Sequence, residues 1–205
     1  MDVIEIKEGI SYVEATDNPL SADIGIAKGN DATWLYDVGN GDKPISGLNG
    51  NFNAVLSHFH PDHIGNISKL NIMNLYVSKE TMKHLPEDIP PSACVHIVNE
   101  PVNIGNIRIF PLPSSHAKGC LGMEIDGEYA FLGDALYCHA GKNGYTYNVQ
   151  FLKQEIDTIE NLGSEYLLVS HCKGLVRERK EVLSELKAIY AKREKGNNEI
   201  LIQFP

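Results

Sequence analysis

The residues of this sequence that could most clearly do chemistry lie in one short run, AVLSHFHPDHIGN, at positions 54–66. Within six positions the run places three histidines and one aspartate: His58, His60, Asp62 and His63. Imidazole and carboxylate groups are costly to crowd together unless a cation binds them, and both are usual ligands of divalent metals. The run therefore predicts a metal site and directs the search to the remaining ligands.

Three further candidate ligands each follow a strand-like segment far along the chain. His116 follows IRIFPLPSS, Asp134 follows YAFLG and His171 follows LLVS. The ends of several buried strands can meet at one edge of a sheet, where a rigid scaffold positions side chains and the loops are free to vary. We therefore expect these three side chains to converge on the histidine run.

The elements that would position these residues are mostly short strands separated by turns. The pattern predicts strands or hairpin arms at 3–6, 10–15, 24–27, 32–38, 53–56, 75–78, 107–113, 121–125, 129–132, 167–169 and 199–204. Helices are expected near 44–48, from 66, over 79–85 with Ser78 as N-cap, over 149–162 and around 183–190. Residues 17–23 and 137–148 are expected to be loops, the second one polar.

The motif HxHxDH, followed in order by a lone His, Asp and His, resembles the metallo-β-lactamase superfamily. The matching residues run from Asp37, in LYDVGNG, to His171 and so cover most of the chain. The resemblance implies an α/β fold, an αββα sandwich of two mixed β-sheets flanked by helices. With 205 residues, we expect one domain over 1–205.

The resemblance also implies two metal sites. His58, His60 and His116 would hold the first metal, Asp62, His63 and His171 the second, and Asp134 would bridge both. Asp37 would orient the histidine loop without binding metal itself. We expect two divalent ions, with zinc first and iron or manganese as alternatives.

Two cations bridged by a carboxylate, roughly 3.5–4 Å apart, serve an in-line attack or an attack on a carbonyl. Water bound between them loses a proton near neutral pH, and the bridging hydroxide becomes the nucleophile. The first metal would polarise the carbonyl oxygen, the second would stabilise the leaving group, and Asp62 would accept or relay the proton. We expect an enzyme, a metallo-hydrolase of this fold, that cleaves a thioester, a lactone or another small ester-like bond.

Other functions use the same ligand set. A persulfide dioxygenase-like oxidoreductase would hold a single iron at His58, His60 and His116 and leave the second site empty. A phosphodiesterase or nuclease of the superfamily usually adds a substrate-binding arm and a basic surface, which this sequence does not show. Glyoxalase II is the nearest named comparison for the metal set, but only about 34 residues follow His171, too few for the helical domain with which that family binds its thioester. Replacement of the second motif histidine by an acid marks flavodiiron proteins, and His60 argues against them.

The substrate wall is expected in the loop over 137–148, with Lys142, Tyr145 and Tyr147 as candidate pocket residues. We expect a solvated loop residue at His139, structural roles for His84 and His96, and surface positions for Lys118 and Lys173. Cys120, Cys138 and Cys172 lie within four residues of a ligand, and we expect each to be a buried small hydrophobic residue.

Composition narrows the class of partner. The chain is 42% hydrophobic and 22% charged, and its net charge of -9 disfavours a nucleic-acid substrate. We see no secretory signal and no apolar run near the roughly 20 residues that span a bilayer. A cytoplasmic protein with reduced thiols and a small-molecule substrate is therefore expected, a β-lactamase is not, and the oligomeric state stays open.

Overall fold

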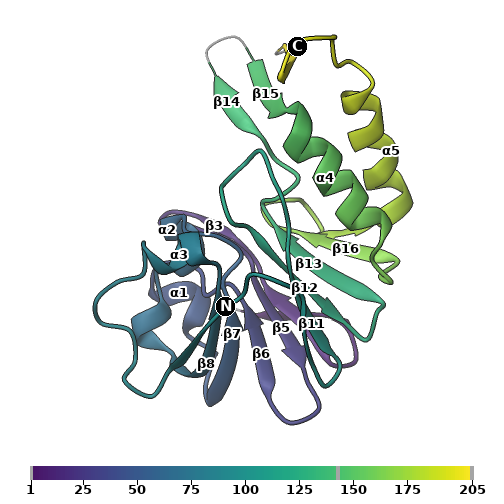
Figure 1. Ribbon diagram of the computed structural model, residues 1–205. Helices are drawn as coiled ribbons and strands as arrows, with labels where there is room; N and C mark the ends of the chain where they lie inside the picture. Colours follow the sequence, from purple (N-terminus) through teal and green to yellow (C-terminus); the bar gives the residue numbers. More distant parts are fainter. Residues whose placement is uncertain (1, 142–143, 204–205) are drawn as a thin grey trace.

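The computed structural model describes residues 2–141 and 144–203 and shows two large mixed β-sheets packed face to face (Figure 1). The first sheet contains, in spatial order, β1 (Val3–Lys7), β2 (Ile10–Val13), β5 (Ile24–Lys28), β6 (Thr33–Tyr36), β7 (Asn51–Val55), β8 (Asn71–Val77) and β9 (Cys94–Ile97). Strands β6 to β9 run parallel to one another, whereas β1, β2, β5 and β6 pair antiparallel.

The second sheet contains, in spatial order, β10 (Val102–Ile104), β11 (Ile107–Pro111), β12 (Leu121–Ile125), β13 (Tyr129–Gly133), β16 (Tyr166–Val169) and β17 (Val176–Glu178). Only β13 and β16 pair in parallel. The turn between β12 and β13 has positive φ at both Asp126 and Gly127, and the Glu128 N–H donates to the Ile125 carbonyl. The predicted hairpin is therefore confirmed.

Apolar side chains from both sheets meet between the layers. Tyr36 of the first sheet and Phe131 of the second stack with ring centroids 5.3 Å apart. Gly25 makes this approach feasible, because a Cβ there would lie 2.5 Å from the Phe131 ring. The two inner faces thus form one shared core.

Helices cover the outer faces of both sheets. The short helices α1 (Asp42–Ile45), α2 (Pro61–Ile64), η1 (Ile67–Lys69) and α3 (Lys79–Met82) lie on the side of the first sheet, and α4 (Val149–Glu160) and α5 (Arg179–Tyr190) on the side of the second (Figure 1). The result is the αββα sandwich that was expected. None of the helices in the described residues combines the length and apolarity needed to cross a bilayer.

Side chains cap the starts of two helices, and the sequence predicted the first of them, Ser78. Ser78 Oγ accepts from the backbone N–H of Thr81, 3.1 Å away, at the start of α3. Asn148 Oδ1 accepts from Gln150 and Phe151 at the start of α4. These caps satisfy backbone donors that the first helical turn leaves free.

Several predicted boundaries were wrong. The helix expected over 79–85 ends at Met82, the strand expected over 53–56 is Asn51–Val55, and the segment from 66 forms a 3₁₀ turn. Residues 17–23 are not a plain loop, since β3 (Thr16–Asp17) and β4 (Leu20–Ser21) pair there. The turn α2 was not predicted at all.

The loop predicted over 137–148 is instead a pair of strands, β14 (His139–Gly141) and β15 (Gly144–Asn148). Strand β15 pairs further with β18 (Glu199–Ile202), which completes a separate three-stranded sheet. The Gly and Asn content of the segment indicated a loop, but the distant strand β18 supplies the hydrogen-bond partners that make it a sheet.

One polar residue is enclosed in the layer between α4 and the second sheet. Glu155 is 0% exposed, and neither carboxyl oxygen has a hydrogen-bond partner. Its helical neighbours Leu152, Ile156 and Ile159 are buried apolar residues. Burial raises the pKa of Glu155 well above its ordinary value, so folding favours the protonated carboxyl.

We predict that Glu155→Met stabilises the protein in a pH-dependent way. Below the ordinary carboxyl pKa, Glu155 is protonated in both the folded and the unfolded chain. The difference in unfolding free energy between variant and wild type then has no contribution from proton binding. As pH rises towards the raised folded pKa, only the unfolded state ionises, so the wild type loses about 1.4 kcal/mol per pH unit. Urea unfolding with chelator present should show a larger gain for Glu155→Met at pH 7.5 than at pH 4.5. The exposed neighbour substitution Gln154→Met is the control, and equal gains at both pH values would contradict the prediction.

Candidate metal centre

The seven candidate ligands come from five segments that end at the same edge of the sandwich. His58 and His60 follow β7, Asp62 and His63 lie in the turn α2, and His116, Asp134 and His171 follow β11, β13 and β16. Pro61 occupies the first position of α2, where its fixed φ suits a helix start. The turn separates the first two histidines from Asp62 and His63.

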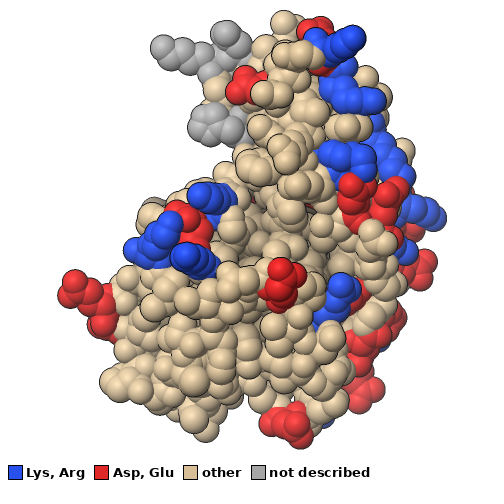
Figure 2. Space-filling view, viewed as in Figure 1, with Lys and Arg blue, Asp and Glu red and all other residues tan. Residues whose placement is uncertain are grey.

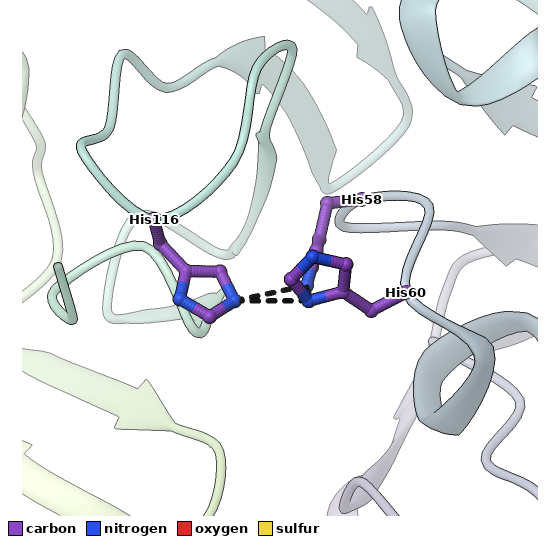
Figure 3. Close-up of side chains that lie close together, drawn as sticks. All are labelled: His58, His60 and His116. Atoms are coloured by element: carbon purple, nitrogen blue, oxygen red, sulfur yellow. Dashed lines mark hydrogen bonds between the residues drawn. The ribbon is translucent and has the colours of Figure 1, made fainter. Parts of the chain in front are cut away.

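Three ring nitrogens converge on one point. His58 Nε2 lies 2.9 Å from His60 Nδ1, and His116 Nε2 lies 3.2 Å from each of them. Figure 3 shows the His116 ring pointing at the other two rings from the opposite side of the opening. Three imidazoles so close have too few N–H donors to satisfy one another, so their lone pairs face a common centre.

The spacing suits a metal ion. Ligands at 2.0–2.1 Å from a tetrahedral ion lie about 3.3 Å from one another. The observed separations of 2.9–3.2 Å approach that value. His58, His60 and His116 therefore fit a cation with small adjustments of the rings, and they form one of the groups of potential ligands in the described residues.

A second group lies beside the first. His171 Nε2 is 3.2 Å from Asp62 Oδ2, and His63 Nε2 is 3.6 Å from the same oxygen. Asp134 Oδ2 lies 3.4, 3.5 and 3.8 Å from the Nε2 atoms of His63, His116 and His171. One oxygen of Asp134 thus faces both groups, as a bridging ligand would.

A buried hydrogen-bond network holds the histidines. Asp37, 0% exposed, accepts from the backbone N–H and the hydroxyl of Ser57 and from Nδ1 of His63, each at 2.7 Å. Because Ser57 donates its only hydroxyl proton to Asp37, its oxygen accepts from His58 Nδ1, 2.9 Å away. Nε2 of His58 is thereby left with its lone pair towards the centre. Asp37 was predicted to orient the histidine loop, and its contact with His63 Nδ1 is one that could do so.

The electrostatics of the centre favour a cation. Burial lowers the pKa of His63, but the carboxylates of Asp37 and Asp134 outweigh it and raise that pKa to about 10. Nε2 of His63, 3.4 Å from Asp134 Oδ2, therefore takes up positive charge, which a bound metal would supply instead. Burial lowers the pKa of His58, His60 and His116, which keeps these rings neutral and available as ligands.

Both candidate carboxylates stay ionised. Burial raises the pKa of Asp134, but the hydrogen bond from His63 and the nearby histidines lower it by more. The pKa of Asp62 is likewise lowered overall, because His171 and His63 outweigh its burial. Two anionic oxygens beside five imidazoles form a donor set typical of zinc, iron or manganese sites.

The sequence analysis missed Asp23, which fixes the His171 segment from the other sheet. Its Oδ2 accepts from the backbone N–H of His171 at 2.9 Å and from Ser170 Oγ at 3.1 Å, while Oδ1 accepts from Ala15 N–H at 3.0 Å. The Tyr137 hydroxyl donates to the Ser170 carbonyl at 2.7 Å. These bonds hold His171 at φ 56°, a conformation rare for a residue with a side chain.

Gly133, just before Asp134, permits the closest contact between the two ligand loops. Its φ is 56°, and a Cβ there would lie 2.8 Å from Ser57 Cβ. Any side chain at this position would push Ser57 away from Asp37 and His58. The glycine therefore joins the Asp134 loop to the histidine network.

The remaining sequence candidates are not among the seven side chains that converge on the centre. His84 stacks on Phe59, and His96 bonds Asn74 and stacks on Tyr76, in agreement with structural roles. His139 lies in β14 rather than in a loop. Cys120 is buried as predicted, but Cys138 and Cys172 are only partly buried, and all four cysteines are free thiols.

A cavity of about 420 Å³ opens beside the centre, bordered by His116, Asp134 and His171. Tyr145 and Tyr147, two of the predicted wall residues, line it. Lys142, the third, lies outside the described residues. The cavity also uses Tyr137 and Cys138, which precede β14.

Comparisons with known proteins decide the fold. No protein-family model matches the sequence, and no curated protein does so. A solved structure of the DIM-1 metallo-β-lactamase superposes with a TM-score of 0.72 at 15% identity, covering 93% of this chain and 96% of that one. An archaeal metallo-β-lactamase superfamily protein from Sulfolobus tokodaii superposes at 0.64 with 17% identity, covering 93% and 89%. This chain has the metallo-β-lactamase fold.

The same fold carries other chemistry. The flavodiiron protein from Giardia intestinalis superposes at a TM-score of 0.64 with 11% identity, covering 94% of this chain and 59% of that one. At such identities the metallo-β-lactamase fold is what the likeness shows, and the choice among reactions must come from the site.

We predict that Asp23→Ala lowers the affinity for metal at the ligand group of Asp62, His63 and His171 more than at the group of His58, His60 and His116. Loss of the carboxylate leaves three donors unpaired, at a cost of about 1–3 kcal/mol in unfolding free energy, and frees the His171 backbone. Metal titration of the folded variant should show one site weakened. Asp23→Asn retains an acceptor oxygen, so its affinity for metal at the His171 group should lie between that of the wild type and that of Asp23→Ala. Equal weakening of both sites would contradict the role assigned to Asp23.

We predict that Gly133→Ala destabilises the fold by about 1–3 kcal/mol through overlap with Ser57. Gly127→Ala is a matched control, because Gly127 also has positive φ, 65°, but a Cβ there meets nothing within 4 Å. Chemical unfolding of both variants separates backbone strain from steric overlap. Equal losses would show that the contact with Ser57 carries no cost.

Proposed function

We propose that this chain is a metal-dependent hydrolase that cleaves a small ester-like bond, a thioester or a lactone. One observation carries the proposal: the two groups of ring nitrogens share the single oxygen Asp134 Oδ2, at 3.4–3.8 Å. A bridged pair of cations is the arrangement that suits attack on a carbonyl. The proposed ligands are His58, His60 and His116 on one side and Asp62, His63 and His171 on the other.

Two divalent cations held here, with zinc expected first, would polarise the carbonyl oxygen and activate water at neutral pH. The residues of the chain do the rest. Asp134 holds the two groups together, and Asp37 fixes the ring of His63 through Nδ1. Asp62, ionised and partly exposed, accepts the proton of the attacking water at a carboxylate oxygen and returns it to the leaving group.

The alternative with a specific observation behind it is a mononuclear iron oxidoreductase, since the His58, His60 and His116 nitrogens are the closest set. The second group, with Asp62 3.2 Å from His171, favours the hydrolase. A phosphodiesterase is less well supported because the chain carries a net charge of -9. One domain over 1–205, a small-molecule substrate and a cytoplasmic location remain predictions.

We predict about two zinc ions per folded chain and hydrolysis that a chelator abolishes. The assay is metal analysis followed by a panel of thioesters, lactones and phosphodiesters with and without chelator. Asp134→Asn should reduce kcat by about 100-fold or more. His96→Ala is the control, because His96 contacts Asn74 and Tyr76 away from the centre. One iron with oxygen consumption would instead support the dioxygenase, and activity unaffected by Asp134→Asn would overturn the catalytic assignment.

A further inference from the structure

The cavity beside the centre has walls of a distinct chemical character. Apart from the proposed ligands at its edge, its described lining residues are Tyr137, Cys138, Tyr145, Tyr147, Ile189 and Ile202. They come from the β14–β15–β18 sheet, the segment before it and helix α5. The volume, about 420 Å³, lies in the range of small-molecule sites.

Two of the three tyrosines of this cavity, Tyr137 and Tyr147, present mainly their rings. The hydroxyl of Tyr137 donates to the carbonyl of Ser170 at 2.7 Å, and that of Tyr147 to the carbonyl of Leu136 at 3.3 Å. Both hydroxyls are therefore already paired with the backbone. Burial raises the pKa of Tyr137 to about 12 and that of Tyr147 further, so neither ring carries charge.

Charge is confined to the edge of the cavity. Among its described lining residues, Asp134 and His171 are the groups that carry charge most readily near neutral pH, and His116 lies beside them. Figure 2 shows a hollow between the α4–α5 part and the α2–α3 part, whose floor is drawn mostly in the colour of uncharged residues, with charged residues on the α2–α3 rim. An anionic substituent inside would lose its hydration without finding a described lysine or arginine partner.

We propose that this cavity binds an uncharged apolar acyl group, with the scissile carbonyl at the edge formed by His116, Asp134 and His171. The inference rests on the proposed hydrolase function and adds the class of substrate. Aliphatic or aryl acyl groups suit it because three tyrosine rings and two isoleucines supply apolar contact area. A cationic group would also be attracted by aromatic rings, but Ile189, Ile202 and Cys138 offer it no counter-charge.

The test uses thioesters of N-acetylcysteamine that differ only in the acyl group. Hexanoyl and phenylacetyl substrates should exceed the acetyl substrate in kcat/KM by about tenfold or more, mainly through a lower KM. A glutaryl substrate, with a terminal carboxylate, and a trimethylammoniobutyryl substrate should not exceed acetyl. Equal values across the series, or preference for either charged group, would overturn the inference.

Binding provides a readout that does not depend on catalysis. In protein treated with chelator, hexanamide should shift NMR signals of the β15 and β18 residues at concentrations where acetamide does not. If no thioester or lactone is hydrolysed, the proposed function fails, and amide binding alone decides the inference. If hydrolysis occurs without a chain-length effect, the function stands and the inference fails.

A pair of adjacent strand residues gives a matched test of location. Ile202 lines the cavity, whereas Leu201, beside it on β18, is 50% exposed. Ile202→Lys should remove the hexanoyl preference and raise kcat/KM for the glutaryl substrate, and Leu201→Lys should do neither. Should Ile202→Lys fail to fold, Ile189→Ala on helix α5 should reduce hexanoyl kcat/KM several-fold and lower the ratio of hexanoyl to acetyl kcat/KM. Wild-type selectivity in the folded variants would place the acyl group elsewhere.

Discussion

The fully buried carboxylate of Asp37 is the constraint on which the site depends. An isolated buried charge is very costly, so it persists only where donors surround it. Here the donors are the backbone N–H and hydroxyl of Ser57 and the Nδ1 of His63. The hydrogen bonds that satisfy Asp37 also orient His63 directly and His58 through Ser57. The same bonds therefore stabilise the buried carboxylate and hold these proposed ligands in position.

The remaining ligands are tied to this network from the other sheet. Gly133 brings the Asp134 loop against Ser57, and Asp23, just before β5 of the first sheet, accepts the backbone N–H of His171. Ser114 further joins the His116 and Asp134 loops, since its hydroxyl donates to the Ala135 carbonyl and accepts from His116 N–H. The candidate centre is therefore held by contacts across the joint of the two sheets, and movement of one sheet against the other would separate the ligands.

The sequence carried the candidate ligands because their types, order and strand-end positions are local features. The structure brings all seven to one edge, as the sequence analysis expected. Asp23 could not be found in the same way, since it lies between two short strands and its partners in the His171 segment are 147 and 148 positions away. The same limit applies to β14 and β15, whose pairing depends on β18, and to Glu155, which falls beside an apolar helical stripe without any local sign that it is enclosed. Local patterns thus predicted the candidate ligands. Long-range pairing determined the residues and strands that hold them in place.

The three-stranded sheet of β14, β15 and β18 is built from segments that contain none of the seven candidate ligands. The wall beside the centre can therefore accumulate substitutions while the ligand loops stay unchanged. Such a division lets a lineage exchange one substrate for another by drift in a small peripheral sheet, without passing through a form that has lost its metal ligands. In this chain Tyr145 and Ile202, which pair between β15 and β18, are positions where substitutions would change the substrate.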